Sequence, residues 1–593
     1  MKTLFFVLLA AVLGGCAAPS VPRQPEAATG WTAKPGWATR HSAVAAANPL
    51  ATQAGWTMLQ EGGSAIDAAV AVQMVLALVE PQSSGLGGGA FLLHFDGKTT
   101  QAYDGRETAP AAADSRLFLD ADGKPLAFRA AIAGGRAVGT PGAVRMLEMA
   151  QRAHGRLPWA RLFAPAIALA EAGFPVSPRL HGLLRAEQQL AQDPVAAAYF
   201  YDAQGKPWPV GHVLKNPELA AVLRRIATEG SQALHEGEVA QAIVAKVRGH
   251  SSNPGHLSLA DLASYRALQR EPLCFDWQPA AQALRICGMP PPGSATIAIG
   301  QILGVLARTP ASSLPLQDGL PGAPWLHLYA EASRLAYADR AQYVADPAFV
   351  QPPAGGWAGL LSPDYLAQRA SLVGPQRAPQ MPAGRPGGTA LAYAPMPEQP
   401  EQGTSHISVV DARGHALAMT STIEDAFGAR QMVNRGKGLA GGFLLNNELS
   451  DFSFVPEAAD GKPVANRVEP GKRPRSSMAP TLVFERGSGR LLMSLGSPGG
   501  AMIIHYAAKA LVGNLQWGLD MQRAIDLPNF GQMEGPLLLE DKRFPTATLQ
   551  GLRANGHSVQ EVPLTSGLQG IAAVPGGLFS GADPRREGIV LGD

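Results

Sequence analysis

The feature that most constrains this chain is the abrupt change of pattern at residues 403–404. From residue 375 to residue 403 the sequence is rich in Pro, Gly, Gln and Ala, with prolines at positions 375, 379, 382, 386, 395, 397 and 400. Such a segment cannot form a long helix or an inner strand, which predicts a flexible arm. Residues 405–410 and 416–423, in contrast, read as two short strands. The arm therefore ends where a strand begins.

The loop between these two strands predicts how they pair. Ala412-Arg413-Gly414 fits a three-residue hairpin loop that ends with a left-handed glycine, which puts Asp411 opposite His415. The same register, continued along the strands, places Thr404 opposite Thr422.

Thr404 is a candidate nucleophile only if the chain is cut in front of it. A threonine hydroxyl at neutral pH needs a base, and the residue's own free α-amino group can supply one. Gly403 most easily adopts the strained backbone from which that hydroxyl can attack the preceding carbonyl. Thr422 could then donate a hydrogen bond to Thr404 Oγ. On these residues alone, the plainer interpretation is the polar start of a strand.

A second motif combines a strand, a glycine turn and a helix. Residues 490–495 read as the strand, and Gly496-Ser497-Pro498-Gly499-Gly500 leads into the helix. Backbone N–H groups at a helix start are free to bind an anion. A phosphate-binding loop is the alternative, but the lysine of a Walker motif is missing.

Taken together, these motifs resemble the γ-glutamyltranspeptidase family. The nucleophile motif of that family is matched by Thr404-Ser405-His406-Ile407-Ser408-Val409-Val410-Asp411. Further landmarks follow in the family's order: Glu61-Gly62-Gly63, Gly85-Leu86-Gly87-Gly88-Gly89, Arg106-Glu107-Thr108-Ala109-Pro110, Leu445-Asn446-Asn447-Glu448, Lys472-Arg473-Pro474-Arg475-Ser476-Ser477-Met478 and Gly496-Ser497-Pro498-Gly499-Gly500. The resemblance covers residues 37 to 593.

This resemblance implies an α/β fold, the four-layer αββα sandwich of N-terminal-nucleophile hydrolases. It implies a large subunit over residues 37–403, a small catalytic subunit over residues 404–593, and a heterodimer of the two. Thr404 would be both nucleophile and amine base after cleavage behind Gly403, with Thr422 bonded to its hydroxyl. Gly499 and Gly500 would form the oxyanion hole.

The resemblance also assigns residues to a γ-glutamyl donor, which carries an α-carboxylate and an α-ammonium. Arg106, Ser476 and Ser477 would bind the carboxylate, because a guanidinium suits that planar anion. Glu448 and Asp451 would bind the ammonium. Glu424 stands where many family members have an asparagine and would add a third acid. The expected reaction moves γ-glutamyl groups from glutathione and related amides to water, amino acids or peptides.

Three alternatives to this function can be compared with the sequence, and the last of them lacks its motif. The segment from Ser453 to Ser476 is short and has no tyrosine, which suggests an open pocket like that of glutaryl or cephalosporin acylases and of enzymes that process poly-γ-glutamate. The acids of the ammonium side argue against an acylase. An unprocessed envelope lipoprotein that only binds γ-glutamyl peptides is the alternative of another class. A Ser-His-Asp hydrolase would show a G-x-S-x-G elbow, which is not found.

The first 16 residues read as an export signal, too short to span a bilayer. Leu13-Gly14-Gly15-Cys16 resembles a lipobox, which predicts a lipid on Cys16, a flexible tether over residues 17–36, and a periplasmic or envelope location at the outer membrane. A plain secretory signal with an incidental cysteine is the alternative.

The remaining chemistry-bearing residues are few. Cys274 and Cys287 could form a disulfide between neighbouring strands or remain two buried thiols. No spacing of Cys and His predicts a metal site, and no cofactor is expected. A formal charge of +2 argues against a nucleic-acid surface.

Hydrophobic periodicity predicts helices over residues 51–61, 143–154, 159–172 and 325–345, and a strand over residues 90–95. Another helix is expected from a Ser64 cap through residue 79, buried on all sides. Alternating helices and strands indicate a layered α/β protein.

Overall fold

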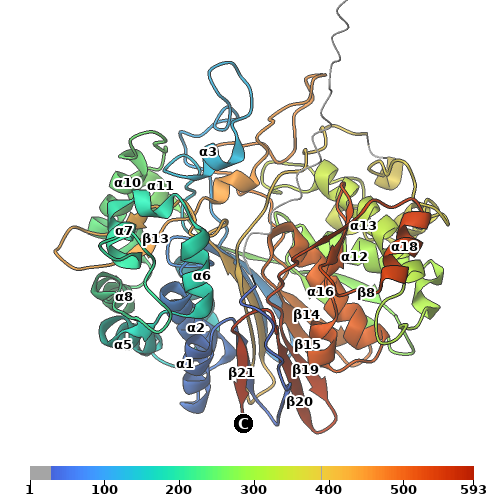
Figure 1. The fold of residues 1–593 in the computed structure, drawn as a ribbon, viewed down its shortest axis with the longest axis horizontal. Helices are drawn as coiled ribbons and strands as arrows, with labels where there is room; N and C mark the ends of the chain where they lie inside the picture. Colours follow the sequence, from blue (N-terminus) through green and yellow to red (C-terminus); the bar gives the residue numbers. More distant parts are fainter. Residues whose placement is uncertain (1–27, 389) are drawn as a thin grey trace, which may run out of the picture.

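Two seven-stranded antiparallel sheets lie face to face at the centre of the molecule, and helices cover the outer face of each (Figure 1). The computed structural model describes residues 28–388 and 390–593. The predicted export signal, Cys16 and the tether as far as residue 27 lie outside the described residues. The four layers, helix, sheet, sheet and helix, are the architecture expected from the sequence.

The strands of the first sheet are, in spatial order, β21 (Ile589–Gly592), β2 (Ala43–Ala46), β10 (Ser405–Val410), β11 (Ala416–Thr422), β3 (Gly89–Phe95), β4 (Thr100–Asp104) and β7 (Leu268–Arg270). Those of the second sheet are β1 (Trp37–Thr39), β20 (Gly577–Ala582), β19 (Gln569–Val574), β15 (Leu491–Gly496), β14 (Thr481–Glu485), β9 (Leu284–Gly288) and β8 (Leu273–Trp277).

The helices on the first sheet's side are α1 (Pro49–Gln60), α2 (Ala65–Val79), α4 (Ala143–His154), α5 (Ala164–Ala172), α6 (Pro178–Ala186), α7 (Pro194–Phe200), α8 (Pro217–Glu229), α9 (Gln232–His235), α10 (Gly237–Arg248) and α11 (Leu259–Ser264). Those on the second sheet's side are α12 (Ala295–Leu306), α13 (Ala323–Tyr343), α15 (Pro363–Ala370), α16 (Ile503–Leu511), α17 (Met521–Asp526) and α18 (Thr546–Ala554). The short helices α3 (Phe128–Ile132) and α14 (Gly356–Gly359) complete the set. Two-residue ladders join β5 (Phe174–Pro175) to β6 (Val213–Leu214) and β12 (Met432–Val433) to β13 (Phe443–Leu444), and a small sheet joins β16 (Phe530–Gly531), β17 (Leu537–Glu540) and β18 (Val559–Val562).

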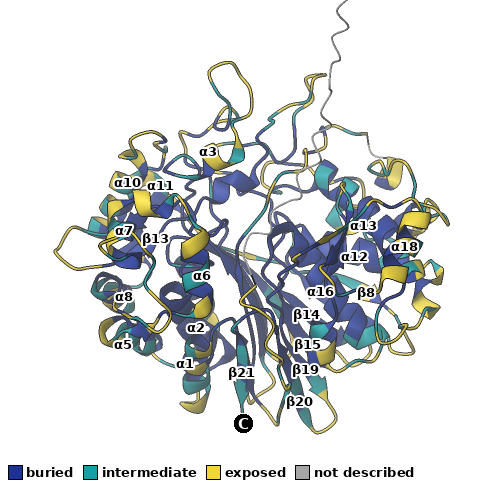
Figure 2. Cartoon of the chain, viewed as in Figure 1, coloured by how far each residue is buried: buried dark blue, intermediate teal, exposed yellow. Residues whose placement is uncertain are grey.

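Helix α2 shows how local sequence sets an element. The Ser64 hydroxyl accepts a hydrogen bond from the Asp67 N–H, and the Asp67 carboxylate accepts one from the Ser64 N–H, a capping box. All its residues are buried between the first sheet and the outer helices (Figure 2). The predicted helix is confirmed, as is the helix over residues 143–154. The helix expected over residues 159–172 starts with a 3-10 turn, η1 (Trp159–Phe163), because Pro165 sits in the first turn of α5. Helix α13 begins and ends two residues earlier than expected.

The space between the sheets is filled by alternate strand residues. Phe91 and Leu93 of β3 point into this central layer, whereas Leu92 belongs to the core under the helices of the first sheet. Leu482 and Phe484 of β14 face them from the second sheet. Both faces of each sheet are therefore buried, as the two-residue period of a strand requires.

Residues on either side of position 403 are interleaved in both sheets. Strands β10 and β11 lie between β2 and β3 in the first sheet, and β14 pairs with β9 in the second. A cut at this position would leave two pieces joined by several strand ladders and by the core between the sheets.

The two cysteines lie opposite each other on the antiparallel pair β8 and β9. They form a disulfide at the edge of the second sheet. Of the two outcomes that the sequence left open, the structure has the bridge.

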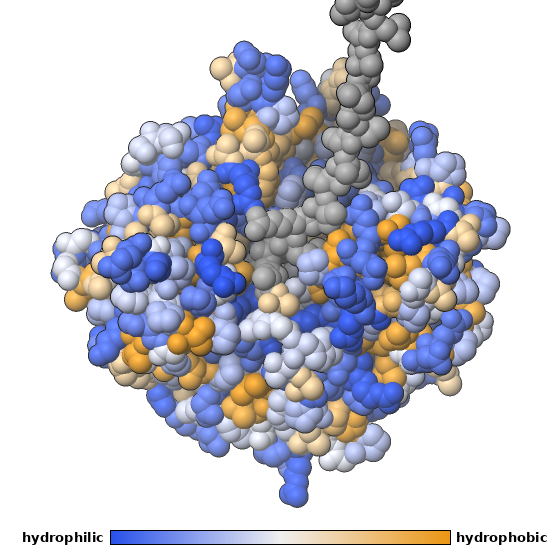
Figure 3. Space-filling model, viewed as in Figure 1, coloured by the Kyte–Doolittle hydropathy of each residue, from blue (hydrophilic) through white to orange (hydrophobic). Residues whose placement is uncertain are grey.

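The surface and the helices give two further facts. On the face shown in Figure 3, hydrophilic side chains cover most of the surface and hydrophobic ones form small separate patches. Within residues 28–388 and 390–593, no helix combines the length and apolar character that a membrane span requires.

Candidate active site

Thr404 lies directly before β10, in the middle of the first sheet. The predicted hairpin register is confirmed: Ser405 pairs with Ser421, and the Asp411 N–H donates to the His415 carbonyl at 2.9 Å. Continued by one residue, it places Thr404 across from Thr422. Thr404 is only 2% exposed.

The backbone at the predicted cut is strained. Thr404 has a φ of 114°, a conformation that a β-branched residue rarely adopts and that costs free energy. Gly403 has a φ of 81°, and a Cβ added to it would lie 1.5 Å from the Glu424 carbonyl oxygen. Only glycine fits at this position.

The glycine turn predicted as an oxyanion hole meets this strained peptide. The Gly499 N–H points to the Gly403 carbonyl oxygen at 3.4 Å, a long hydrogen bond to the carbonyl that Thr404 would attack. The turn connects β15 to a 3-10 turn, η6 (Gly500–Met502), and then to α16, as the sequence indicates. A Cβ on Gly500 would lie 1.8 Å from the Glu401 carbonyl oxygen, so the arm crosses directly over the turn.

Thr422 is buried at the end of β11. Its hydroxyl oxygen accepts a hydrogen bond from the Glu424 N–H at 2.8 Å, which leaves its own proton available to a partner. Among the described residues, no hydrogen bond joins the hydroxyls of Thr404 and Thr422. The proposed bond between them stays a prediction.

Arg106, Glu448 and Asp451 come together as a buried ion-pair cluster. The Arg106 guanidinium donates to both carboxylates, to the Pro474 carbonyl at 3.2 Å and to the Arg475 carbonyl at 2.8 Å. Burial raises the pKa of both acids although Arg106 opposes it. One oxygen of each acid, Glu448 Oε2 and Asp451 Oδ1, has no hydrogen-bond partner within the described part of the chain.

Glu424 adds the third acid that the sequence suggested. Its side chain accepts hydrogen bonds from the Gln402 N–H at 3.1 Å and from Asn447 Nδ2 at 2.9 Å. Burial, together with the nearby charges of Asp451, Asp425 and Glu448, raises its pKa well above the usual range. Glu424 is thus a third buried carboxyl group near Glu448 and Asp451, and among the described residues it has no ion pair with an arginine.

The two predicted serines differ in their partners. Ser476 Oγ accepts from the Met478 N–H at 3.2 Å. Ser477 Oγ donates to the Glu401 carboxylate and accepts from Arg340 Nη2 at 2.6 Å. The sequence did not predict that Arg340 or Glu401 would belong to this site.

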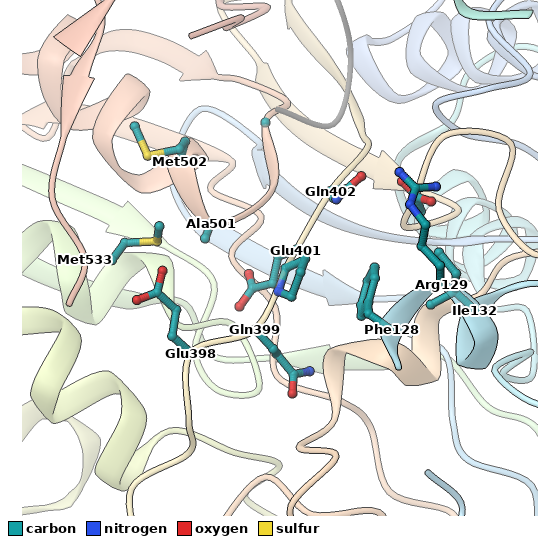
Figure 4. A pocket seen from close by; sticks show the side chains of 13 residues that line it. Phe128, Arg129, Ile132, Glu398, Gln399, Glu401, Gln402, Ala501, Met502 and Met533 are labelled. Atoms are coloured by element: carbon teal, nitrogen blue, oxygen red, sulfur yellow. The ribbon is translucent and has the colours of Figure 1, made fainter. Parts of the chain in front are cut away.

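One narrow cavity joins most of the candidate residues, but Glu424 and Gly499 are not among those that line it, and Gly499 lines a neighbouring hollow instead. The narrow cavity is lined by Arg106, Glu401, Gln402, Thr404, Thr422, Glu448, Asp451, Ser476, Ser477, Met478, Gly500 and Ile503. A larger outer hollow lies across the arm, between Phe128, Arg129 and Ile132 on one side and Met502 and Met533 on the other (Figure 4). Glu401 and Gln402 line both spaces, so the end of the arm separates the nucleophile from the outer hollow.

The end of the arm is held in place in the continuous chain. Gln399 Nε2 donates to the carbonyls of Ser450 at 2.6 Å and Phe452 at 2.7 Å. Together with the contacts of Glu401 and Gln402, these bonds fix residues 399–402, although the arm was expected to be flexible throughout. Between residues 375 and 403, the described part contains no strand and one 3-10 turn at Pro386–Gly388.

Among the described residues, no group of three or more His, Cys, Asp or Glu side chains is placed to hold a metal ion.

Three residues near the nucleophile were not predicted from the sequence as part of the site: Arg340, Glu401 and Arg475. The sequence did hold a clue to two of them, because Arg475 stands in the motif Lys472-Arg473-Pro474-Arg475-Ser476-Ser477-Met478 and Glu401 lies two residues before Gly403, behind which the chain would be cut.

Comparison with known proteins gives consistent results. The model of the family described as Gamma-glutamyltranspeptidase matches residues 51–592. The glutathione hydrolase proenzyme of Bacillus subtilis is 34% identical and covers 93% of this chain and 91% of its own. The acylase ACY 1 proenzyme of a Pseudomonas species is 34% identical, with 90% of each chain covered. The solved cephalosporin acylase of Bacillus halodurans superposes with a TM-score of 0.78 at 25% identity, covering 97% of this chain and 99% of that one.

Proposed function

Because the chain belongs to the γ-glutamyltranspeptidase family, we propose that it moves γ-glutamyl groups from glutathione and related amides to water, amino acids or peptides. It is an enzyme of that family, and relatives of similar length are named as glutathione hydrolase proenzymes. The specific chemistry at Thr404 is part of the proposal.

The first step is self-cleavage. Thr404 Oγ attacks the Gly403 carbonyl carbon. The developing oxyanion accepts a hydrogen bond from the Gly499 N–H, whose nitrogen lies 3.4 Å from that oxygen before the attack. The peptide C–N bond breaks, the Thr404 nitrogen takes the hydroxyl proton, and an ester remains. Water then hydrolyses the ester, giving a carboxylate on Gly403, a free Thr404 hydroxyl and a free Thr404 amine.

Turnover uses the same groups. The Thr404 amine accepts the hydroxyl proton while Oγ attacks the γ-carbonyl of the donor. The Gly499 and Gly500 N–H groups stabilise the oxyanion, and the proton passes to the leaving amine. Thr422 would hold the Thr404 hydroxyl through its own free proton. Water or an acceptor amine then resolves the γ-glutamyl ester.

One observation carries the choice of donor: the group of buried acids beside Thr404. Glu448 and Asp451 line the cavity that contains Thr404, and each has one oxygen that lacks a partner within the described residues. Glu424, whose pKa these two acids help to raise, has no ion pair with an arginine in the described part of the chain. A buried acid without a counter-charge is unfavourable, and the α-ammonium of a γ-glutamyl donor would supply both charge and hydrogen-bond donors. A glutaryl group lacks that ammonium, which disfavours the acylase alternative despite the acylase names among the relatives.

Paired donors test this proposal. The purified, cut enzyme should hydrolyse L-γ-glutamyl-p-nitroanilide with a kcat/KM about 10- to 100-fold above that of glutaryl-p-nitroanilide, since a charged hydrogen bond contributes about 1.5–3 kcal/mol. Glu424→Gln should bring the two kcat/KM values closer together, because it should lower the value for L-γ-glutamyl-p-nitroanilide and leave that for glutaryl-p-nitroanilide unchanged. A glutaryl donor turned over as well as the γ-glutamyl donor would favour the acylase.

Two further proposals concern assembly and location. The large piece, residues 37–403, and the small piece, residues 404–593, would stay together as a heterodimer because both contribute strands to both sheets. Export through residues 1–16, a lipid on Cys16 and an envelope location are proposed from the sequence alone. Incorporation of labelled palmitate into the wild type, and none into Cys16→Ser, would support the anchor; equal labelling would contradict it.

A further inference from the structure

The turn that would form the oxyanion hole has no side chains at its two donor positions to hold it in place. Gly499 and Gly500 have φ values of 134° and 56°, in the region that favours glycine. Donors to an oxyanion act only when they lie about 2.7–3.1 Å from the developing charge. The direction of these two N–H groups therefore depends on how neighbouring residues hold the backbone.

Tyr337 of α13 binds the backbone directly after the two glycines. Its hydroxyl donates a hydrogen bond to the Ala501 carbonyl at 2.7 Å, and Ala501 lies within the 3-10 turn η6. The side chain is buried, and burial raises the pKa of the Tyr337 hydroxyl above its usual range. The hydroxyl therefore stays protonated and available as a donor at neutral pH.

Two contacts hold the Tyr337 ring without using its hydroxyl. The ring stacks on that of His505 from α16, with 5.2 Å between the centroids and 8° between the planes. The Arg340 guanidinium carbon lies 5.5 Å from the centroid of the same ring, within the range of a cation–π contact. A phenylalanine at this position would keep both contacts, so the hydroxyl can be removed while the ring stays in place.

Other groups hold the opposite side of the turn. The Ser497 hydroxyl oxygen accepts a hydrogen bond from the Gly567 N–H at 3.2 Å. The Tyr506 ring packs against Gly499, where an added Cβ would lie 2.5 Å from a ring carbon. These contacts hold the start of the turn and Gly499, and the Tyr337 bond holds the side that leads into α16.

We propose that Tyr337 is a positioning residue, which holds the turn so that the Gly499 and Gly500 N–H groups stay aimed at the reacting carbonyl. It acts through the Ala501 carbonyl and lies outside the residues that line the cavity of Thr404 and the outer hollow. The inference rests on the proposed γ-glutamyl function where it concerns turnover. Self-cleavage uses the same turn and tests the inference without any donor.

Tyr337→Phe removes the hydroxyl alone. A turn that has lost this bond would spend part of its time away from the productive position, and the loss of rate is limited by the free energy of one hydrogen bond. We expect kcat for L-γ-glutamyl-p-nitroanilide, and the rate constant of self-cleavage, each to fall by about 3- to 10-fold. Formation and hydrolysis of the Thr404 ester would slow by the same factor, so KM should stay within about twofold of the wild-type value.

Tyr343→Phe is the matched control. Tyr343 lies at the end of the same helix, is also buried, and donates its hydroxyl to a backbone carbonyl, that of Gly384, at 2.6 Å. This variant loses the same kind of hydrogen bond away from the glycine turn. Thermal unfolding should show a similar loss of stability in both variants, but Tyr343→Phe should keep the wild-type kcat and rate of self-cleavage.

A pair of ligands separates the turn from the rest of the site. L-2-Amino-4-boronobutanoate places boron where the donor has its reacting carbon. Thr404 Oγ adds to the boron, the hydroxyl proton passes to the Thr404 amine, and the tetrahedral anion that results needs the N–H groups of the turn. L-2-Aminopentanoate has the same α-carboxylate and α-ammonium but no oxygen at the corresponding carbon. In the cut protein, Tyr337→Phe should raise the inhibition constant of the boronate by about 3- to 10-fold and leave that of L-2-aminopentanoate unchanged.

The outcomes keep the two proposals apart. A wild type that cuts itself but turns over no donor removes the proposed γ-glutamyl function, while the rates of self-cleavage in the two variants still test Tyr337. An active wild type whose rates and boronate inhibition are unchanged in Tyr337→Phe removes the positioning role alone. A Tyr337→Phe protein that loses rate only through a higher KM, or that binds both ligands more weakly, would show that Tyr337 supports the pocket and not the turn.

Discussion

Replacing Gly403 by alanine should nearly stop self-cleavage. A left-handed backbone costs an L-residue about 1–2 kcal/mol. The larger effect is steric, because the added Cβ would lie 1.5 Å from the Glu424 carbonyl oxygen, and one of two buried backbones must move. Such a shift would carry the Gly403 carbonyl away from the Gly499 N–H, and loss of one oxyanion donor slows a reaction by about 100- to 1000-fold.

The assay is a time course of cleavage. Freshly purified uncut protein is incubated, and the fraction cut is read by denaturing electrophoresis and intact mass. Gly414→Ala is the matched control, since Gly414 also has a positive φ of 78° but no atom within 4 Å of an added Cβ. It should lose a little stability and cut at the wild-type rate. A Gly403→Ala protein that cuts as fast as the wild type would refute the role given to this backbone geometry.

Two further perturbations follow from the structure. In an uncut Thr404→Ala background, Glu401→Gln should lower the free energy of unfolding by about 3–5 kcal/mol, because it leaves Arg340 and Arg475 buried without a carboxylate. Glu398→Gln is the control, since Glu398 lies on the same arm, feels the charge of Arg340 only at a distance and forms no ion pair with an arginine among the described residues. Equal losses in the two variants would contradict the pairing. The pKa of Glu401 is lowered from 4.5 to about 2, so the stability that this ion pair contributes should be fully present above pH 4.5 and lost as the pH falls toward 2. The difference in the free energy of unfolding between the Glu401→Gln protein and its parent, measured by urea titration, should therefore shrink over that pH range. Replacing both Cys274 and Cys287 by serine should lower the free energy of unfolding by about 2–3 kcal/mol in denaturant titrations, because the bridge joins positions 13 residues apart in the chain. The same change should leave kcat/KM unchanged. A large loss of activity would show that the edge of the second sheet matters to the site.

Local rules explain what the sequence could predict. The hairpin register follows from a three-residue loop with Gly414 at its end, and α2 follows from the Ser64 cap and an unbroken apolar run. Both depend on residues a few positions apart. The order of the motifs was enough to suggest the four-layer fold.

The pairings in the site could not be predicted in the same way. Glu401 meets Arg340 and Arg475 across 61 and 74 residues of chain, and Arg106 meets Glu448 across 342. Each of these charges, considered alone, would more often be solvated on the surface. Only tertiary packing brings these pairs together, as where α13 places Arg340 against Glu401 of the arm, and composition does not encode such packing.

Intact mass spectrometry of the purified wild type beside Thr404→Ala tests the central claim most directly. We predict that the wild type yields a fragment spanning residues 404–593 that starts with a free Thr404 amine, and that the variant stays a single chain. A wild type that remains uncut under folding conditions would contradict the threonine mechanism and favour a protein that only binds γ-glutamyl peptides.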